Sequence, residues 1–252
     1  VPSGFVKLQI EGPTGYKNFS EVVELDSGTL DLTGANAVVL EKDIRASAQK
    51  LLTSGRVEQA VARLREIPKD HSDYLLARHE LGEIYLTMLG QPEKAVQAFE
   101  EVTANAEVKG FNDKRFVGSH INKGIALFLQ AESLSKSGDE VGAKKSYAQS
   151  IKVLDEVTPQ LRFVPRDQYA QAVHNVAFHK ALIRHRLWKQ TKDLGLLNET
   201  VKAWDQYLSG SAVSLPVDEE SVHYVENAKV YLRQAQTQLA NATPATEGGE
   251  QR

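Results

Sequence analysis

The sequence predicts an all-α protein, an α-solenoid of about four antiparallel helix pairs with a C-terminal capping helix, behind a short β-rich N-terminal segment. Two observations support this fold class. Two segments superpose when one is moved by 34 residues, because Ser47-Ala48-x-x-Leu51 falls on Leu81-Gly82-x-x-Tyr85. The apolar spacing also changes from a strand period to a helical period near Val38. Units of this length stack on their neighbours because none can bury its apolar face alone.

The composition is that of an ordinary globular protein. The 252 residues are 41% hydrophobic and 25% charged, with a formal net charge of -3. No block of five like charges occurs, so we expect no nucleic-acid partner. No stretch approaches the roughly 18 to 20 apolar residues that a membrane span needs. The chain has no cysteine, which excludes disulfides and thiol catalysis.

The first residues bear on localisation. The chain begins Val1-Pro2 without a methionine, so it is either a processed mature form or a chain shortened upstream. If Val1 is a processed N-terminus, we expect an exported or periplasmic protein. Otherwise we expect a cytoplasmic one.

Residues 1–37 have a strand period. Val6, Leu8 and Ile10 alternate with polar residues, and segments 19–25 and 29–32 could form two further short strands. The turn spacing resembles the end of a small β-sandwich of the carbohydrate-binding-like or surface-anchoring kind. We expect a short β-rich lead that packs on the first helices, or the remnant of an upstream domain.

Residues 38–240 form the predicted helical domain. The first pair has one apolar face near residues 44–51 and a second at 57–67, and the second pair covers 74–89 and 92–104. In the second helices, Ala60-x-x-x-Leu64 nearly falls on Ala95-x-x-x-Phe99. The repeat therefore extends to both helices of each pair.

The later pairs depart from this register. A long helix at 114–136 precedes Ala143-x-x-x-Tyr147, and a helix at 166–189 precedes one at 198–208 with Thr200-x-x-x-Trp204. A link at 209–216 leads to a last helix at 217–240. Val225, Leu232 and Leu239 on that helix are expected to cover the open end of the fourth pair. Residues 241–252 are small and polar, and are expected to be a disordered tail.

This pattern of a small pair, an aromatic residue or Leu, and then Ala and Phe four apart resembles the tetratricopeptide repeat (TPR). The resemblance covers about residues 41–208. It implies a protein or peptide partner held in a concave groove, which the first helix of each pair lines. The residues that this register places in the groove are Lys42, Arg45, Gln49, Leu52, His79, Glu83, Leu86, Asn122 and Asn175.

The residues that could act in catalysis or metal binding do not form a recognisable catalytic or metal-binding motif. His79 and Glu80 resemble part of a zinc-protease helix, but the second histidine is missing. His174 and His179 are five apart, about 140° around a helix, so they do not share a face. No nucleophile elbow or phosphate-binding loop occurs. We therefore expect no enzyme, no cofactor and no metal.

Three hypotheses remain from the sequence. The first is a non-enzymatic scaffold that binds a peptide or protein in the groove. The second is a structural assembly protein that forms homo-oligomers through the β lead or the solenoid ends. The third is a helical-repeat enzyme, which no catalytic constellation supports. Mass in solution separates the first two.

Overall fold

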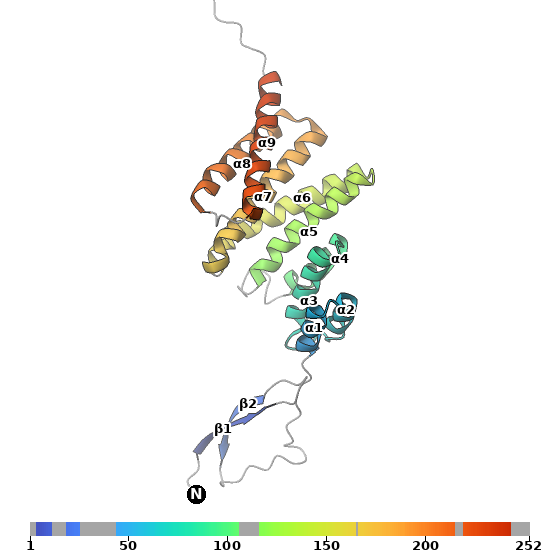
Figure 1. Cartoon of the computed structure of the whole chain (residues 1–252), viewed down its shortest axis with the longest axis vertical. Coiled ribbons are helices and arrows are strands. Elements are labelled where there is room, and N and C mark those ends of the chain that lie inside the picture. Colours follow the sequence, from blue (N-terminus) through green and yellow to red (C-terminus); the bar gives the residue numbers. More distant parts are fainter. Residues whose placement is uncertain are drawn as a thin grey trace, which may run out of the picture. The chain divides into compact units, whose positions relative to one another are not determined.

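The computed structural model describes residues 4–11, 19–25, 44–105, 116–164, 166–214 and 219–242 (Figure 1). Contacts divide the chain into two compact units, Val1–Leu81 and Gly82–Arg252. The all-α repeat fold predicted from the sequence is confirmed in the helical part of both units. None of the described helices is long and apolar enough to cross a membrane.

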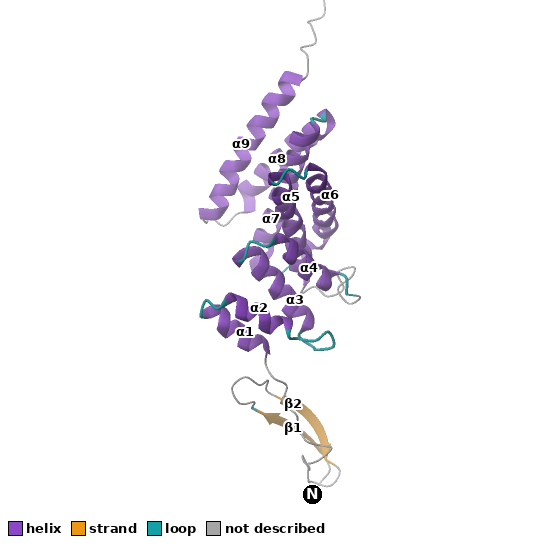
Figure 2. Ribbon diagram, turned by 90° about the vertical axis from the view of Figure 1, so that its right-hand side faces the viewer, coloured by secondary structure: helices purple, strands orange, loops and turns teal. Residues whose placement is uncertain are grey.

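The first unit begins with a β-hairpin. Strands β1 (Gly4–Ile10) and β2 (Phe19–Leu25) pair antiparallel, with Val6 opposite Val23 (Figure 2). The third segment expected as a strand, residues 29–32, lies outside the described residues. The described part of this region is a single two-stranded hairpin, so the expected likeness to a β-sandwich gains no support.

Three helices complete the first unit. Helices α1 (Ile44–Thr53) and α2 (Val57–Arg65) form the first pair, and α3 (Tyr74–Glu83) opens the second. Ala48 on α1 and Ala60 on α2 are almost fully buried, as expected for small residues where two helices cross closely. Leu64 is also fully buried, so the predicted apolar face of α2 is the one that packs.

The second unit continues the repeat with longer helices. A π-helical turn, η2 (Ile84–Met88), ends the first helix of the second pair, and α4 (Pro92–Thr103) is its partner. Helices α5 (Val117–Lys136) and α6 (Glu140–Val157) form the third pair, followed by a 3₁₀ segment, η4 (Thr158–Phe163). Helices α7 (Arg166–Thr191) and α8 (Leu194–Ser214) form the fourth, and α9 (Glu219–Ala242) follows. The paired helices lie side by side (Figure 1).

Predicted boundaries of the fourth pair and of the last helix differ from the structure. Helix α8 begins at Leu194, four residues before the predicted start at 198. Residues 209–216 were expected to be a link, but α8 continues through Ser214. Helix α9 reaches Ala242, two residues beyond the predicted end at 240. The small residues of segment 209–214 carry no proline, so nothing in the backbone stops the helix before Pro216.

The turn between the two helices of each pair has a repeated backbone geometry. One residue in each turn has a positive φ, and these residues are Gly55, Gly90, Gly138 and Lys192. Glycine adopts this left-handed conformation without steric cost, whereas a residue with a Cβ does not. Lys192 is therefore the exception among four equivalent positions.

The fourth pair differs from the others in the distance between its turn and its packing residues. Ala60, Ala95 and Ala143 each lie five residues after the positive-φ residue of their turn, and Leu197 holds that place after Lys192. Thr200 and Trp204, which the sequence places in the Ala-x-x-x-Phe positions, are fully buried as Ala143 and Tyr147 are, but they lie three residues farther from the turn.

Gly82 lies at a close helix crossing, as predicted. A Cβ on Gly82 would stand 2.5 Å from the Phe99 ring of α4. Gly124 on α5 repeats this arrangement, since a Cβ there would stand 2.6 Å from Leu154 of α6. Because glycine has only a hydrogen atom as its side chain, the second helix of the pair can pack closely against the first helix at these two positions.

Helix α9 covers the fourth pair. Ala228 and Leu232 pack on a core that includes Trp204, while Ala235 and Leu239 pack on Trp188 and Leu197. The predicted covering roles of Leu232 and Leu239 are thus confirmed. Val225 is half-buried, and the fully buried residues of α9 are its two alanines, Ala228 and Ala235.

Candidate partner-binding surface

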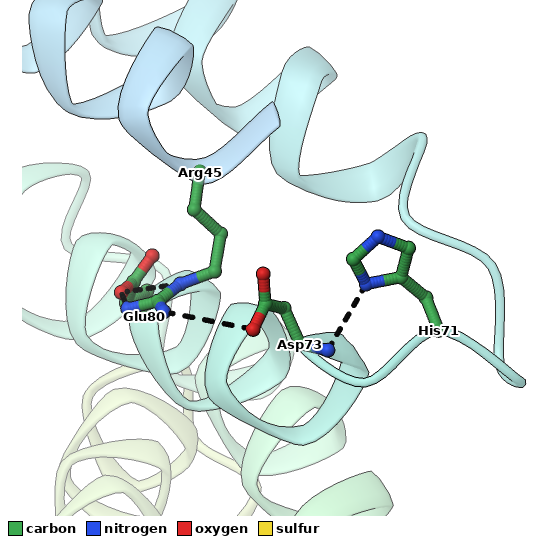
Figure 3. Close-up of polar contacts among 4 residues, drawn as sticks. All are labelled: Arg45, His71, Asp73 and Glu80. Atoms are coloured by element: carbon green, nitrogen blue, oxygen red, sulfur yellow. Dashed lines mark hydrogen bonds and ion pairs between the residues drawn. The ribbon is translucent and has the colours of Figure 1, made fainter. Parts of the chain in front are cut away.

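Arg45, a predicted groove residue, is used inside the first unit. Its guanidinium donates to Oε1 of Glu80 on α3 and lies 4.0 Å from Oδ1 of Asp73 (Figure 3). The backbone N–H of Asp73 donates to Nδ1 of His71 at 3.0 Å. The Arg45 and Glu80 side chains are 31% and 28% exposed, so water screens the pair only in part. Arg45 fastens α1 to α3 and is less available to a partner than the sequence suggested.

The other predicted groove residues of the first unit are distributed over α1 and α3. Gln49 is exposed one turn after Arg45, and Leu52 is half-buried near the end of α1. His79 is half-buried on α3, next to Glu80. Lys42 lies outside the described residues.

In the second unit, two predicted groove residues meet. The Nδ2 group of Asn122 on α5 donates to Oε1 of Glu83, the last residue of α3, at 3.4 Å. Glu83 is exposed and Asn122 is half-buried. Leu86, in the π-helical turn that follows Glu83, is half-buried. The first helices of the second and third pairs therefore share a polar contact.

One side of α5 carries half-buried Asn122 and the exposed residues Leu129 and Ser133 in line. Asn122, Leu129 and Ser133 follow each other at seven and four residues, which places them within about 40° of arc on the helix. Gly124, which contacts Leu154 of α6, lies on the opposite side of α5. The Leu129 side is thus turned away from the second helix of its own pair, and Leu129 is 38% exposed.

Asn175 forms hydrogen bonds with two other residues of α7. Its Oδ1 accepts a hydrogen bond from Nε2 of Gln171 at 2.9 Å, and its carbonyl oxygen lies 2.7 Å from Nδ1 of His179. The His179 ring in turn packs edge-on against Phe128 of α5, with centroids 5.6 Å apart. Asn175 therefore lies near the contact between two first helices, α5 and α7.

A partly buried polar network joins three helices of the second unit. The Tyr147 hydroxyl of α6 donates to Oε1 of Glu132 on α5, and Nε of Arg186 on α7 donates to the same oxygen at 2.9 Å. Burial and the Glu132 carboxylate raise the pKa of Tyr147 far above its usual value. Burial acts to lower the pKa of Arg186, but Glu132 outweighs it and raises that pKa. A neutral tyrosine and a paired arginine hold the helices together here.

The buried histidines belong to the aromatic core. His185 is fully buried, both of its ring nitrogens are unpaired, and its ring lies 5.2 Å from Trp188 and 5.0 Å from Tyr231. Burial, with the nearby Lys189 and Arg186, lowers the pKa of His185 to about 4, so the ring is neutral at pH 7. The described residues contain no group of three acidic or histidine side chains that could hold a metal.

Comparison with known proteins supports the repeat. The family model described as the tetratricopeptide repeat protein 21 ARM repeat matches residues 41–102. This match and the helix pairs make the fold TPR-like, and TPR-like folds commonly serve as scaffolds for protein–protein interaction. No curated protein gives a significant match.

Solved structures of low similarity were also found. A structure of MamA is 15% identical, with a TM-score of 0.40, and the match covers 77% of this chain and 95% of that one. The Podosopora anserina putative kinesin light chain with TPR-like repeats is 18% identical, with a TM-score of 0.42 and coverage of 80% and 96%. The P58(IPK) TPR domain is 17% identical, with a TM-score of 0.30 and coverage of 77% and 56%.

Sequence reasoning missed two features of the second unit. The pairing of Glu132 with Arg186 joins residues 54 apart, and no local pattern signals it. Lys192 did leave a signal, because Lys192-Asp193 stands where the third pair has Gly138-Asp139. Both aspartates cap the following helix: Oδ1 of Asp139 and Oδ1 of Asp193 accept backbone N–H bonds of 2.8 and 2.7 Å.

Proposed function

We propose that the chain is a non-enzymatic scaffold that binds a peptide or protein partner along the first helices of its pairs. The observation that carries this proposal is the line of side chains on α5, where exposed Leu129 provides apolar surface and half-buried Asn122 provides an amide. Glu83, in contact with Asn122, extends the same surface onto the preceding first helix.

These side chains suit an extended or helical peptide. An Asn amide can donate to a backbone carbonyl and accept from a backbone N–H, so it can pair with main-chain groups of a partner. Leu129 supplies apolar surface on which a partner side chain can be desolvated. Glu83 adds one negative charge, which favours a basic group at that end of the peptide.

The test uses a double variant of α5. Asn122→Ala with Leu129→Ser is expected to weaken a partner, first isolated by affinity capture, by about 1 to 3 kcal/mol in calorimetry. The matched control is Gln97→Ala on α4, an exposed side chain on a second helix. Equal affinities of the parent and the α5 variant, with both folded, would move the binding surface away from the first helices.

A further inference from the structure

We propose that the second unit has a separate binding surface that takes an acidic peptide segment bearing an apolar side chain. The surface is a hollow of about 990 Å³ between the end of α7, the start of α8 and the last turns of α9. It is called the α7–α9 hollow here. The residues that carry the argument are Trp188, Lys189, Lys192, Leu194, Leu197 and Arg233.

The lining of the α7–α9 hollow is basic. It includes Lys189, Lys192 and Arg233 and no aspartate or glutamate. Within the described part of the chain, none of these three side chains forms an ion pair; Nε of Arg233 donates to the carbonyl oxygen of Lys229 at 3.3 Å. Some cations of the same helices are paired, as Arg186 is with Glu132 and Lys229 is with Glu226. The three charges are therefore available to carboxylates of another chain.

The base of the hollow is apolar. Leu197 and Trp188 are almost fully buried beneath it, and Leu194, at the start of α8, is 50% exposed. The Nζ of Lys192 lies 5.7 Å from the centre of the Trp188 ring. A leucine or phenylalanine of a partner would be desolvated on Leu194 and Trp188, while carboxylates on either side of it meet the cations.

The backbone at Lys192 gives an independent reason to assign a function to this place. Its φ is 57°, in the left-handed region where the equivalent turns of the other three pairs have glycine. Holding a side chain in that region costs roughly 1 to 2 kcal/mol. Residues kept in such conformations cluster at functional sites. Here the strained residue is the one that places an amine beside Trp188 in the basic hollow.

The combination of charge and apolar surface favours a peptide over a nucleic acid. A phosphate polymer would be held by the cations alone and would gain little from Leu194. The chain's own residues 243–252 are another possible occupant, because Ala242 lies at the rim of the hollow and Glu247 and Glu250 follow it. The experiment separates these occupants from the one proposed.

The probe is a short fluorescent peptide of Asp and Glu with a central Leu and Phe, titrated with the full chain and followed by anisotropy. Lys192→Gly, Lys192→Asn and Lys189→Gln should each weaken binding about fivefold or more. Lys202→Gln, which removes an exposed charge of α8 outside the hollow, should not. Added salt should weaken binding because it screens the charges. Lys192→Gly should at the same time raise the melting temperature, because glycine adopts the positive φ without strain. Weaker binding together with higher stability would not be expected if Lys192 had only a structural role.

Four results would overturn the proposal. The first is unchanged affinity of both Lys192 variants, and the second is equal binding of an acidic peptide that lacks Leu and Phe. The third is displacement of the probe by single-stranded RNA at equal charge concentration. The fourth is binding only to a chain that ends at Ala242, which would show that residues 243–252 fill the hollow. The variants of α5 leave this hollow unchanged, so failure here and failure of the proposed function are distinguishable.

Discussion

Gly82 and Gly124 determine how closely the two helices of one pair approach each other. Gly82 acts within the second pair, and Gly124 acts within the third. The Phe99 ring and the Leu154 side chain occupy the space that a Cβ would need. Because cores are packed at crystal-like density, neither neighbour can move far without displacing others. Residue size at these two places therefore acts directly on stability.

Gly82→Leu is expected to lower the free energy of unfolding by about 1 to 3 kcal/mol or more, because the new side chain overlaps the Phe99 ring. The measurement is a denaturant or thermal melt. Gly210→Ala in α8 is the control, since its added methyl meets open space and should be neutral or slightly stabilising. A Gly82→Leu melt equal to that of the parent would contradict the close crossing.

His185 should make stability depend on pH. Its pKa is lowered to about 4 by burial, whereas the unfolded chain keeps a value near 6.5. The unfolded state therefore binds the proton more readily between these values, and stability is complete above about pH 6.5 and declines as the pH falls toward 4. The loss is on the order of 1 to 3 kcal/mol.

Denaturant titrations between pH 7 and pH 4 measure this loss. A His185→Leu variant should show a flatter stability profile than the parent over that interval, because the buried titrating group is gone. The exposed His223→Leu is the control and should follow the parent. Parallel profiles for the parent and His185→Leu would show that His185 is not the group responsible.

The sequence predicts the structural role of some residues and not of others. The small residues Ala48, Ala60 and Gly82 follow from the repeat, because their size is dictated by local helix packing. The Arg45 pair with Glu80 does not follow, since it depends on which rotamer of a long side chain the neighbouring helix stabilises. Small packing positions are thus predictable from the repeat, but the partners of charged side chains are not.

Among the helices, α9 is the one that covers the apolar surface of the fourth pair. Its two fully buried alanines bring it close to the fourth pair, and Tyr231 stacks on Trp204 with ring centroids 5.4 Å apart. Without α9, Trp204, Leu197 and Trp188 would lose this cover. A contiguous apolar surface of that kind promotes association.

A chain ending at Ser214 is accordingly expected to aggregate or to bind a hydrophobic dye strongly. A chain ending at Ala242 is the matched control and should behave as the parent in both assays. Light scattering and dye fluorescence provide the readouts. If the shorter chain were soluble, fully helical and silent toward the dye, the covering role of α9 would be refuted.

Element boundaries were predictable where a residue marks them. Gly55, Gly90 and Gly138 have the positive φ of three turns, and Pro92 stands at the start of α4. The break between α7 and α8, predicted at residues 190–197, is shorter in the structure, and the continuation of α8 through Ser214 was not predicted, because serine-rich segments can also be helical. Both errors fall in the fourth pair, where the repeat pattern is weakest.

At the scale of the whole molecule, the scaffold and the homo-oligomer predict different masses. A scaffold that works as a single chain should have one molar mass across concentrations in multi-angle light scattering. In a single-chain scaffold, the surface of α5 around exposed Leu129 remains available to a different protein. In a homo-oligomer, each copy would bury part of its surface against another copy. A stable dimer or larger species would favour assembly instead.

The central claim is that a partner lies on the exposed side of α5, and photo-crosslinking tests it most directly. A photoreactive phenylalanine analogue would replace Leu129 in one variant and Gln149, an exposed residue of α6, in the other. We predict that the captured partner crosslinks through position 129 and not through position 149. Crosslinking through 149 with none through 129 would contradict the account.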